Sequence, residues 1–209
     1  MLKFKVMGKL RYLSHRETMS VFERALIRGG LDLYFTQGFN PRPKISLPLP
    51  RSVGLACSDD MLCAELIAGV DSVESIKRKI QEHLPDGIEI TNVRLMAGRV
   101  RPQALKVAYG FRFACADASL KKKVEEVKSK IASCEELLVT RTGGKHKMAR
   151  QINVLPFIES VDYEGDEVCV WCNISGGGTV RVEELVEILQ IDKPMLAQPI
   201  IRKEVVYSV

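Results

Sequence analysis

The chain has few of the features that assign a protein to an enzyme or membrane class. It has 3 histidines and 1 tryptophan among 209 residues. No apolar run approaches the ~20 residues that a membrane-spanning helix needs. The first residues, Met1 to Val6, lack the long apolar centre of a secretory signal peptide. We therefore expect a cytoplasmic protein that does not bind to a membrane.

Sequence patterns for a metal centre are also missing. The cysteines lie mostly inside apolar, strand-like runs, at Cys57, Cys63, Cys115, Cys134, Cys169 and Cys172. Such positions are typical of small buried side chains in a reducing compartment rather than of a disulfide framework. Cys169 and Cys172 have C-x-x-C spacing, but on a strand their thiols point to opposite faces because the side-chain period is two. Since no second C-x-x-C, flanking histidine or three-cysteine loop accompanies them, we expect no metal and no cofactor.

One glycine run allows two interpretations. Gly176, Gly177 and Gly178 stand directly before a segment of helical periodicity that contains Glu183 and Glu184. Backbone N–H groups in such a position can bind phosphate. The run lacks the Gly-Lys-Ser/Thr ending of a Walker A loop and does not match G-x-G-x-x-G. It fits either a phosphate loop or a flexible strand-to-helix turn.

The composition is that of a globular protein with a mild positive charge. Hydrophobic residues make up 46% and charged residues 27%, and the formal net charge is +5 at pH 7. A chain of this length can bury a core without disulfide staples. The charge permits nucleic acid or an acidic protein as a partner, so the placement of the cations matters more than their sum.

The expected secondary structure elements follow a similar order in the two halves of the chain. In the first half, Ser14 and Glu17 form an S-x-x-E capping box, and an apolar stripe predicts a helix that ends at Gly29 and Gly30. Around it we expect strands at residues 2–7, 31–35, 61–68 and 88–95, an extended insertion at 45–49 and a helix at 72–83. After a linker at 97–103 we expect strands at 106–116, 136–141, 154–163, 167–174 and 200–207 and helices at 119–133 and 182–190.

This order predicts an α+β fold of two ferredoxin-like β-α-β-β-α-β units in tandem. Each unit would have an antiparallel sheet with helices on one face. The units would cover residues 1–98 and 104–209, and they share a pattern of elements without visible sequence identity.

The stretch at residues 36–44 is the most distinctive in the chain. Gly38 can supply a positive φ, and Pro41 and Pro43 fix φ and extend the residues before them, which predicts a stiff, shaped loop. The loop carries one aromatic residue and two cations, Phe39, Arg42 and Lys44. We interpret it as a binding loop, and the alternative is a structural turn with solvated cations.

A second basic stretch lies at residues 141–150. In the predicted order both stretches fall between the second and third strands of their halves. If the halves pack about a pseudo-twofold axis, the two loops flank one groove. Its cations would be Arg42, Lys44, Arg141, Lys145, Lys147 and Arg150. The alternative is again a surface loop whose charges are only solvated.

His15 is the candidate for acid–base chemistry. At 100° per residue it projects on the same side as Met19, Phe22 and Leu26, so we expect it to face the sheet. There it would be either a general base or acid, or a buried histidine with a satisfied hydrogen bond. No Asp, Cys or second His stands near it in the sequence to complete a site.

Two segments resemble the signatures of the radical-SAM-linked protein family, an uncharacterised bacterial group. They are Gly-Lys-Leu-Arg-Tyr-Leu-Ser-His at residues 8–15 and Gln-Gly-Phe-Asn-Pro-Arg-Pro-Lys at residues 37–44. The resemblance extends over most of the chain. Members of that family are encoded beside, or fused to, a radical SAM protein, which implies that this chain works with a separate radical SAM enzyme. The chain departs from a later family motif, Val-Asp-Val/Ile-Arg-Pro, with Asn153 in place of its Asp and Leu155 in place of its Arg.

These observations lead to one functional hypothesis and two alternatives. We expect an accessory RNA-binding or substrate-presenting protein without its own catalytic activity, in which the six cations contact phosphate and Phe39 stacks on a base. The tandem plan also looks like that of CRISPR repeat-processing endoribonucleases, which makes a metal-independent nuclease using His15 the first alternative. A protein-docking module without nucleic acid is the second.

Overall fold

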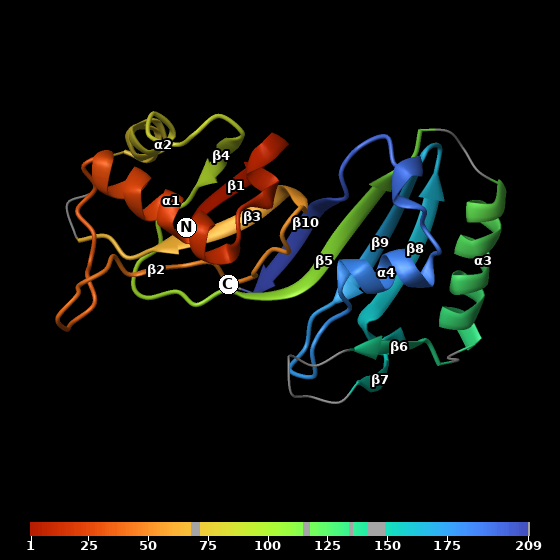
Figure 1. Cartoon of the computed structure of the whole chain (residues 1–209). Helices are drawn as coiled ribbons and strands as arrows, with labels where there is room; N and C mark the ends of the chain where they lie inside the picture. The colour runs from red at the N-terminus through yellow and green to blue at the C-terminus, as the bar shows by residue number, and fades with distance from the viewer. Residues whose placement is uncertain (68–71, 115–117, 134–135, 142–148, 209) are drawn as a thin grey trace. The chain divides into compact units, whose positions relative to one another are not determined.

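The computed structural model describes residues 1–67, 72–114, 118–133, 136–141 and 149–208 (Figure 1). The chain divides into two compact units. Unit 1 comprises Met1–Ala104 and Tyr207–Val209, and unit 2 comprises Leu105–Val206. Both units are mixed α/β with mostly antiparallel strand pairing, and the described residues contain four α-helices. None of these helices is long and apolar enough to cross a membrane.

Unit 1 is built on a sheet with the strand order β4-β1-β3, and a short strand, β2, also pairs with β3. The strands are β1 (Leu2–Val6), β2 (Ile45–Ser46), β3 (Ala56–Ala64) and β4 (Ile88–Val93). β1 pairs antiparallel with both neighbours, which places Leu2 opposite Leu62 of β3 and Val93 of β4. Every second residue of β1 is buried, as expected when one face of a strand lies against a core.

Helices α1 (His15–Arg28) and α2 (Val73–Gln81) pack on that buried face. The predicted capping box of α1 is confirmed: Ser14 Oγ accepts a hydrogen bond from Glu17 N at 3.3 Å, and Glu17 Oε2 accepts one from Ser14 N at 2.8 Å. The helix ends at Gly29, where a Cβ would lie 2.9 Å from the carbonyl oxygen of Lys79 on α2. Glycine therefore allows the two helices to approach each other closely.

One hydrophobic cluster joins both helices to the sheet of unit 1. The rings of Phe4 on β1 and Phe22 on α1 lie 4.5 Å apart at a tilt of 60°. The other members come from every element named above except β2, and they include Leu2, Val6, Ala25, Leu26, Leu62, Ile76, Ile80, Ile88 and Ile90. Aromatic packing and aliphatic burial of this kind are the main stabilising terms of a small core.

The predicted strand at residues 31–35 is wrong. Leu33 and Phe35 form only isolated bridges, to Leu66 and Pro43, and the regular strand in this part of the chain is the two-residue β2, which pairs with β3. The glycine and prolines of residues 36–44 interrupt regular pairing along this edge, because proline cannot donate to the ladder. The next strand also differs from the prediction, since β3 covers Ala56–Ala64 rather than residues 61–68.

Unit 2 has a sheet with the strand order β10-β5-β9-β8. Its strands are β5 (Gln103–Arg112), β8 (Ile158–Glu164), β9 (Glu167–Asn173) and β10 (Ile201–Ser208). β9 pairs antiparallel with β5 and β8, and burial alternates strictly along it. Helices α3 (Ala118–Ser133) and α4 (Val182–Ile188) contribute Leu120, Val124 and Leu185 to the buried side chains.

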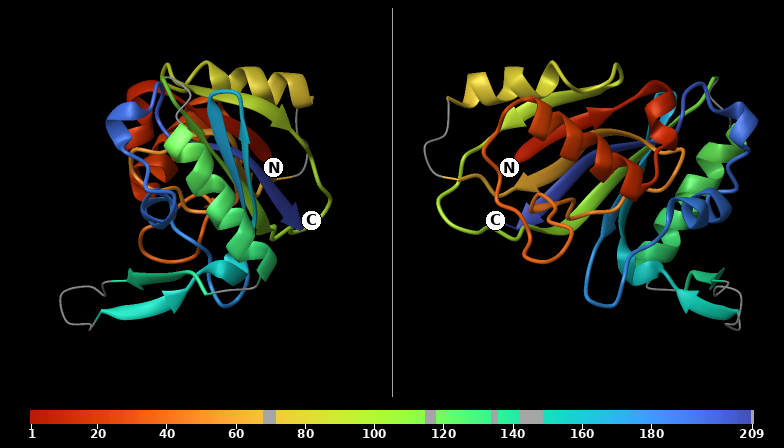
Figure 2. Two further views of the ribbon diagram at one scale, coloured as in Figure 1. Left: turned by 90° about the vertical axis from the view of Figure 1, so that its right-hand side faces the viewer. Right: turned by 60° about the vertical axis from the view of Figure 1, so that its left-hand side comes forward.

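A separate hairpin distinguishes unit 2 from the predicted order. β6 (Leu138–Arg141) pairs only with β7 (Arg150–Asn153), and Figure 2 shows this hairpin projecting away from the four main strands. The strand predicted at residues 154–163 is in fact β8, preceded by the short 3-10 helix η2 (Leu155–Phe157). The predicted place of the two basic stretches, between the second and third strands of their halves, is therefore wrong: the first lies between α1 and β2, and the second lies between β6 and β7, ahead of β8.

Candidate nucleic-acid interface

The loop at residues 36–44 is braced at its base by its own backbone. Thr36 N donates to Arg42 O at 2.8 Å, and Lys44 N donates to Tyr34 O at 2.8 Å. Arg42 N also donates to Thr36 Oγ1 at 3.0 Å. Pro43 is buried, so the C-terminal part of the loop is anchored in unit 1. These bonds hold the loop in one shape, as the pattern of glycine and proline predicts.

The tip of this loop presents an aromatic ring to solvent. Phe39 is 105% exposed relative to a reference side chain, and Gly38 before it has φ +135. Arg42 is exposed on the same loop, which Figure 1 shows in orange just before β2. A fully exposed phenylalanine buries no apolar area, so it adds nothing to folding stability, and its position on a braced loop indicates a contact residue.

Lys44 at the base of the loop is partly engaged within unit 1. Its Nζ lies 5.6 Å from the centre of the Tyr34 ring and 3.7 Å from Glu65 Oε2. Glu65 also forms an ion pair with Arg99, whose Nε lies 3.0 Å from Glu65 Oε1. Two cations therefore share one carboxylate, and this part of the surface keeps a net positive charge.

The second predicted loop contributes differently. Lys145 and Lys147 lie outside the described residues, and Arg150 is exposed at the start of β7. Arg141, on the opposite strand, is directed inward: Nε and Nη2 donate to the two carboxylate oxygens of Glu184 at 2.6 and 2.9 Å. Nη2 also donates to Thr179 O at 2.6 Å. The charge of Arg141 is thus used to tie β6 to the beginning of α4.

Glu184 is the centre of this ionic arrangement. Burial by itself raises the pKa of Glu184, but hydrogen bonds from the Arg141 side chain and the Arg181 backbone, together with the charges of both arginines, hold that pKa below its usual value. The hydrogen bond with Glu184 in turn raises the pKa of Arg141. Both groups stay charged at neutral pH, which keeps this short two-point contact strong.

The glycine run at residues 176–178 forms a closed turn. Ser175 N donates to Gly178 O at 3.0 Å and Gly178 N donates to Ser175 O at 2.9 Å. Gly177 N donates to Ser175 Oγ at 3.3 Å. Three of the N–H groups that a phosphate would need are therefore used within the turn. The arrangement favours the interpretation as a strand-to-helix turn, with Gly176 at its tip.

His15 does not face the sheet, contrary to the prediction. It is the first residue of α1 and is exposed, and the first buried residue of that helix is Thr18. The apolar stripe that contains Phe22 and Leu26 begins one turn later, because the first turn precedes the part of α1 that packs on the sheet. The imidazole is accessible to a ligand, and it is not held as a buried core side chain.

The cysteines that the structure describes behave as buried or half-buried thiols. Cys169 and Cys172 lie on β9, where Cys172 points into the core and Cys169 to the other face, which confirms the predicted opposite orientation. Burial raises the pKa of both thiols. Cys115 and Cys134 lie outside the described residues. Within the described part of the chain, no three potential metal ligands come together.

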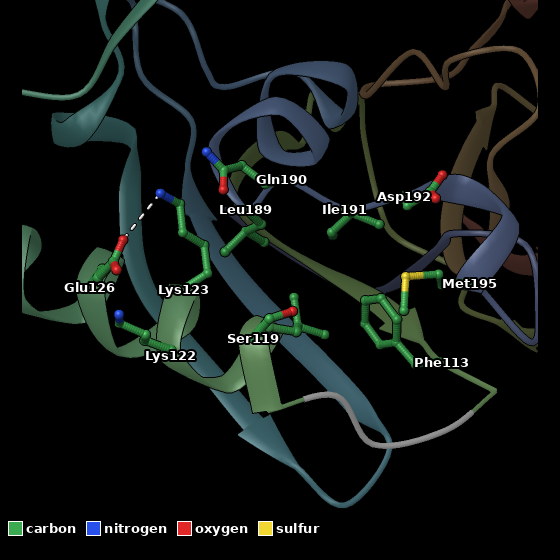
Figure 3. A pocket seen from close by; sticks show the side chains of 11 residues that line it. Phe113, Ser119, Lys122, Lys123, Glu126, Leu189, Gln190, Ile191, Asp192 and Met195 are labelled. Atoms are coloured by element: carbon green, nitrogen blue, oxygen red, sulfur yellow. Dashed lines mark hydrogen bonds and ion pairs between the residues drawn. The ribbon is translucent and has the colours of Figure 1, made fainter.

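A cavity in unit 2 was not anticipated from the sequence. It has a volume of about 360 Å³ and lies between the start of α3, the end of α4 and the 3-10 helix η3 (Lys193–Met195) (Figure 3). Phe113, Leu189 and Ile191 form apolar walls. Polar groups of both signs line the rest, and Lys123 is already paired with Glu126 at 3.1 Å. The size suits a small molecule, but the mixed charges select no class of ligand.

Asn153 has a structural role that sequence reasoning missed. Its Oδ1 accepts hydrogen bonds from Leu137 N at 3.0 Å and from Leu155 N at 3.1 Å. Both donors need only an oxygen acceptor, which the amide of Asn and the carboxylate of Asp supply equally. The exchange of Asp for Asn at this position therefore preserves the contact, and Leu155 only begins η2.

A comparison with protein families covers most of the chain. The model of a family described as "Uncharacterized protein conserved in bacteria (DUF2344)" matches residues 1–191. This range includes all of the loop at residues 36–44, the β6–β7 hairpin and α4. No curated protein matches the chain.

Proposed function

For this chain, which belongs to the DUF2344 family of uncharacterised bacterial proteins, we propose the function of a non-catalytic accessory module that binds RNA through the loop at residues 36–44. Phe39 stacks on a base, and Arg42 and Lys44 contact the phosphates beside it. Arg150 is a further candidate contact, and so are Lys145 and Lys147. Arg141 is assigned no phosphate contact because its guanidinium is bound by Glu184.

The observation that carries this proposal is the exposure of Phe39 on a braced loop. An aromatic ring that is 105% exposed is open to a stacking base, and the backbone bonds at the base of the loop reduce the backbone freedom that binding would otherwise have to remove. Stacking is tolerant of sequence, since every base has a π-face. Arg42 on the same loop supplies a charge that a purely apolar partner would not use.

The partner and the fold are part of the same proposal. The signatures at residues 8–15 and 37–44 resemble the radical-SAM-linked family, which supports a separate radical SAM enzyme as the protein that acts on the bound RNA. We also interpret each unit as ferredoxin-like. In unit 2 the sheet order β10-β5-β9-β8 corresponds to the order 4-1-3-2 of such a unit, with the β6–β7 hairpin as an insertion.

Binding of single-stranded RNA to the wild type and to loop variants tests the proposal. Phe39→Ala should weaken binding about 10-fold, because loss of one stacked base costs about 1–3 kcal/mol. The slope of log affinity against log salt should stay unchanged, since stacking releases no counterions. Arg42→Ala should instead reduce the magnitude of that slope by about 0.7.

Matched controls exist on the exposed face of α1. Ile27 is 51% exposed and Arg28 is exposed beside it. Ile27→Ala and Arg28→Ala should leave RNA binding unchanged, since neither residue belongs to the loop. If the wild type binds no RNA but retains a protein in a pull-down analysed by mass spectrometry, the RNA proposal fails and the protein-docking alternative takes its place.

A nuclease is the second candidate, and the exposure of His15 favours it. The imidazole is accessible at the first turn of α1, next to the cation Arg16. A histidine in such a position can act as general acid or base on an RNA 2′-hydroxyl, and a neighbouring cation can stabilise the developing charge. Incubation of purified protein with bacterial RNA in EDTA distinguishes the two functions. Defined fragments that disappear in His15→Ala would show cleavage, and intact RNA would support the accessory role.

A further inference from the structure

A second aromatic and cationic surface lies on unit 1, on the 3-10 helix η1 (Gly8–Tyr12) and the first turn of α1. Tyr12 is 56% exposed, and the guanidinium carbon of Arg11 lies 4.3 Å from the centre of its ring. Arg11 Nη2 donates to Tyr12 Oη at 2.8 Å, and Nη1 donates to Gly8 O at 2.7 Å. The planar cation is therefore held against the ring rather than dispersed in solvent.

The backbone under this pair is fixed from the other side. Arg11 O accepts hydrogen bonds from Gly54 N at 2.9 Å and from Arg51 Nη1 at 3.0 Å. Gly54 has φ +89, and a Cβ on it would lie 3.6 Å from Tyr12 Cε1. The tyrosine ring thus lies close to both the backbone of Gly54 and the guanidinium of Arg11.

Arg51 holds η1 at a substantial desolvation cost. Its side chain is buried, Nη1 donates to Leu55 O at 2.5 Å, and Nε lies 3.5 Å from Asp60 Oδ2. The side chains of Arg51 and Asp60 are only 5% and 6% exposed. Buried ion pairs often add little net stability compared with apolar residues of the same volume. What this pair provides is a cation that binds the carbonyl oxygen of Arg11 and so fixes the position of the exposed surface.

The surface has an excess of positive charge. Lys9, Arg11 and Arg16 carry it, and Lys9, His15 and Arg16 are exposed. The nearest acidic residue in sequence, Glu17, is already bound by Ser14 through its backbone N–H and its hydroxyl. That contact also closes the N-terminus of α1, so an anion would be bound by side chains rather than by the helix end.

We propose that this η1 surface, formed by Lys9, Arg11, Tyr12 and Arg16, is a second contact site for single-stranded RNA. The Arg11 guanidinium, already stacked on Tyr12, receives a base on its outer face, and Lys9 and Arg16 contact the phosphates on either side. The inference rests on the proposed function, and it extends RNA binding beyond the loop at residues 36–44. It also assigns Arg51 as a positioning residue, because Arg51 acts on RNA only through the backbone of η1.

RNA binding and ultraviolet crosslinking of the full chain test this inference. Arg16→Ala removes a phosphate contact and should reduce the magnitude of the salt slope by about 0.7. Arg11→Ala removes the group on which the base stacks and should weaken binding of a single-stranded RNA about 10-fold with the slope nearly unchanged. Tyr12→Ala should weaken binding to a similar degree with the slope unchanged. Arg11→Lys keeps the charge and loses the planar stack, so it should bind as weakly as Arg11→Ala. Arg24→Ala, an exposed cation on α1, is the charge-matched control and should bind as the wild type does.

The outcomes separate this inference from the proposed function. Binding that is weakened by Phe39→Ala and unchanged by Arg11→Ala and Tyr12→Ala would overturn the η1 site and leave the loop site standing. Binding that is weakened only by the η1 variants would support the η1 site and overturn the loop. No RNA binding by the folded wild type would overturn both. A thermal unfolding transition equal to that of the wild type shows that each variant is folded.

Discussion

In unit 1 the guanidinium of Arg51 contacts Asp60, and in unit 2 the guanidinium of Arg141 contacts Glu184, but the two arginines hold different structures in place. Arg51 is the more buried, at 5% against 17%, and it donates to carbonyl oxygens of η1 and of the β2–β3 connection. Arg141 makes the shorter contact, at 2.6 Å, and ties the β6–β7 hairpin to α4. The Arg51–Asp60 pair supports the exposed basic surface of η1. The Arg141–Glu184 pair instead turns a cation, Arg141, inward and away from the surface.

The comparison shows why a count of cations is a poor guide to a binding site. Arg42 and Arg141 are both arginines in basic segments of the sequence, yet only Arg42 is exposed. Arg11 is half-exposed and was not predicted as a contact, but the buried Arg51 fixes its position. The partners of each cation, rather than its place in a charged run, decide whether it is available to a phosphate.

The largest effect should come from breaking the more buried pair. Arg51→Ala leaves Asp60 buried without its arginine, and we expect a loss of about 3–5 kcal/mol in the free energy of unfolding, measured by urea denaturation. The double variant Arg51→Met with Asp60→Leu should recover most of that stability. It should still bind RNA more weakly than the wild type, because η1 has lost the hydrogen bond to Arg11 O.

This double variant sharpens the distinction between stability and positioning. If Arg51 contributes only to stability, the recovered double variant should bind RNA as the wild type does. Such a result would contradict the role of Arg51 in fixing η1. The matched double variant in unit 2, Arg141→Met with Glu184→Leu, should leave RNA binding at η1 unchanged, since Arg141 contacts α4 and not η1.

A smaller effect is expected from the pair in unit 2. Glu184→Ala should cost about 2 kcal/mol, because hydrogen bonds to charged groups contribute about 1.5–3 kcal/mol and the side chain of Arg141 keeps some access to water. The change also removes the carboxylate that accepts from Arg181 N at 2.8 Å at the start of α4. Unfolding monitored by circular dichroism measures this loss in the free energy of unfolding. A loss equal to that of Arg51→Ala would contradict the ranking by burial.

The pH dependence of the same pair follows from the lowered pKa of Glu184. A carboxylate whose folded pKa lies below the unfolded value of about 4.3 contributes stability that is present above that pH. The contribution is lost as the pH falls through the folded pKa. Wild-type stability should therefore fall more steeply below about pH 4.3 than that of Glu184→Gln, measured by urea unfolding at a series of pH values. Parallel curves would contradict the charged state assigned to Glu184.

The sequence predicted those features that depend only on residues close together in the chain. Ser14 with Glu17 and the glycines after Arg28 define α1, and the period of two along β9 predicts the opposite orientation of Cys169 and Cys172. These features depend on backbone propensity and alternation, which a single sequence contains.

Features that depend on distant partners were not predicted. Glu184 lies 43 positions from Arg141, and no local pattern links them. The short strand β6 has the composition of a main-sheet strand, and only its pairing with β7 shows that it belongs to a separate two-stranded sheet. His15 follows the apolar period of α1 but stands one turn before the sheet, so periodicity placed it on the wrong side. Tertiary contacts decide all three positions.

The smallest expected effect compares the ends of α1 and α4, which share one hydrogen-bond pattern. Leu31 N donates to Leu26 O at 3.3 Å after α1, and Ile191 N donates to Val186 O at 2.9 Å after α4. In both cases the residue before the donor has a positive φ. It is Gly30 at +67 in unit 1 and Gln190 at +51 in unit 2.

Glycine adopts this left-handed conformation without a steric cost, whereas a residue with a Cβ pays about 1 kcal/mol. Gln190→Gly should therefore stabilise the protein by about 0.5–1 kcal/mol, which raises the melting temperature by about 1–4 °C in calorimetry. The reciprocal Gly30→Gln should destabilise it by a similar amount, since a Cβ on Gly30 would meet no atom within 4 Å and only the backbone cost remains. A loss of stability in Gln190→Gly would mean that the Gln190 side chain, which lines the cavity in unit 2, makes a contact worth more than the strain of its backbone.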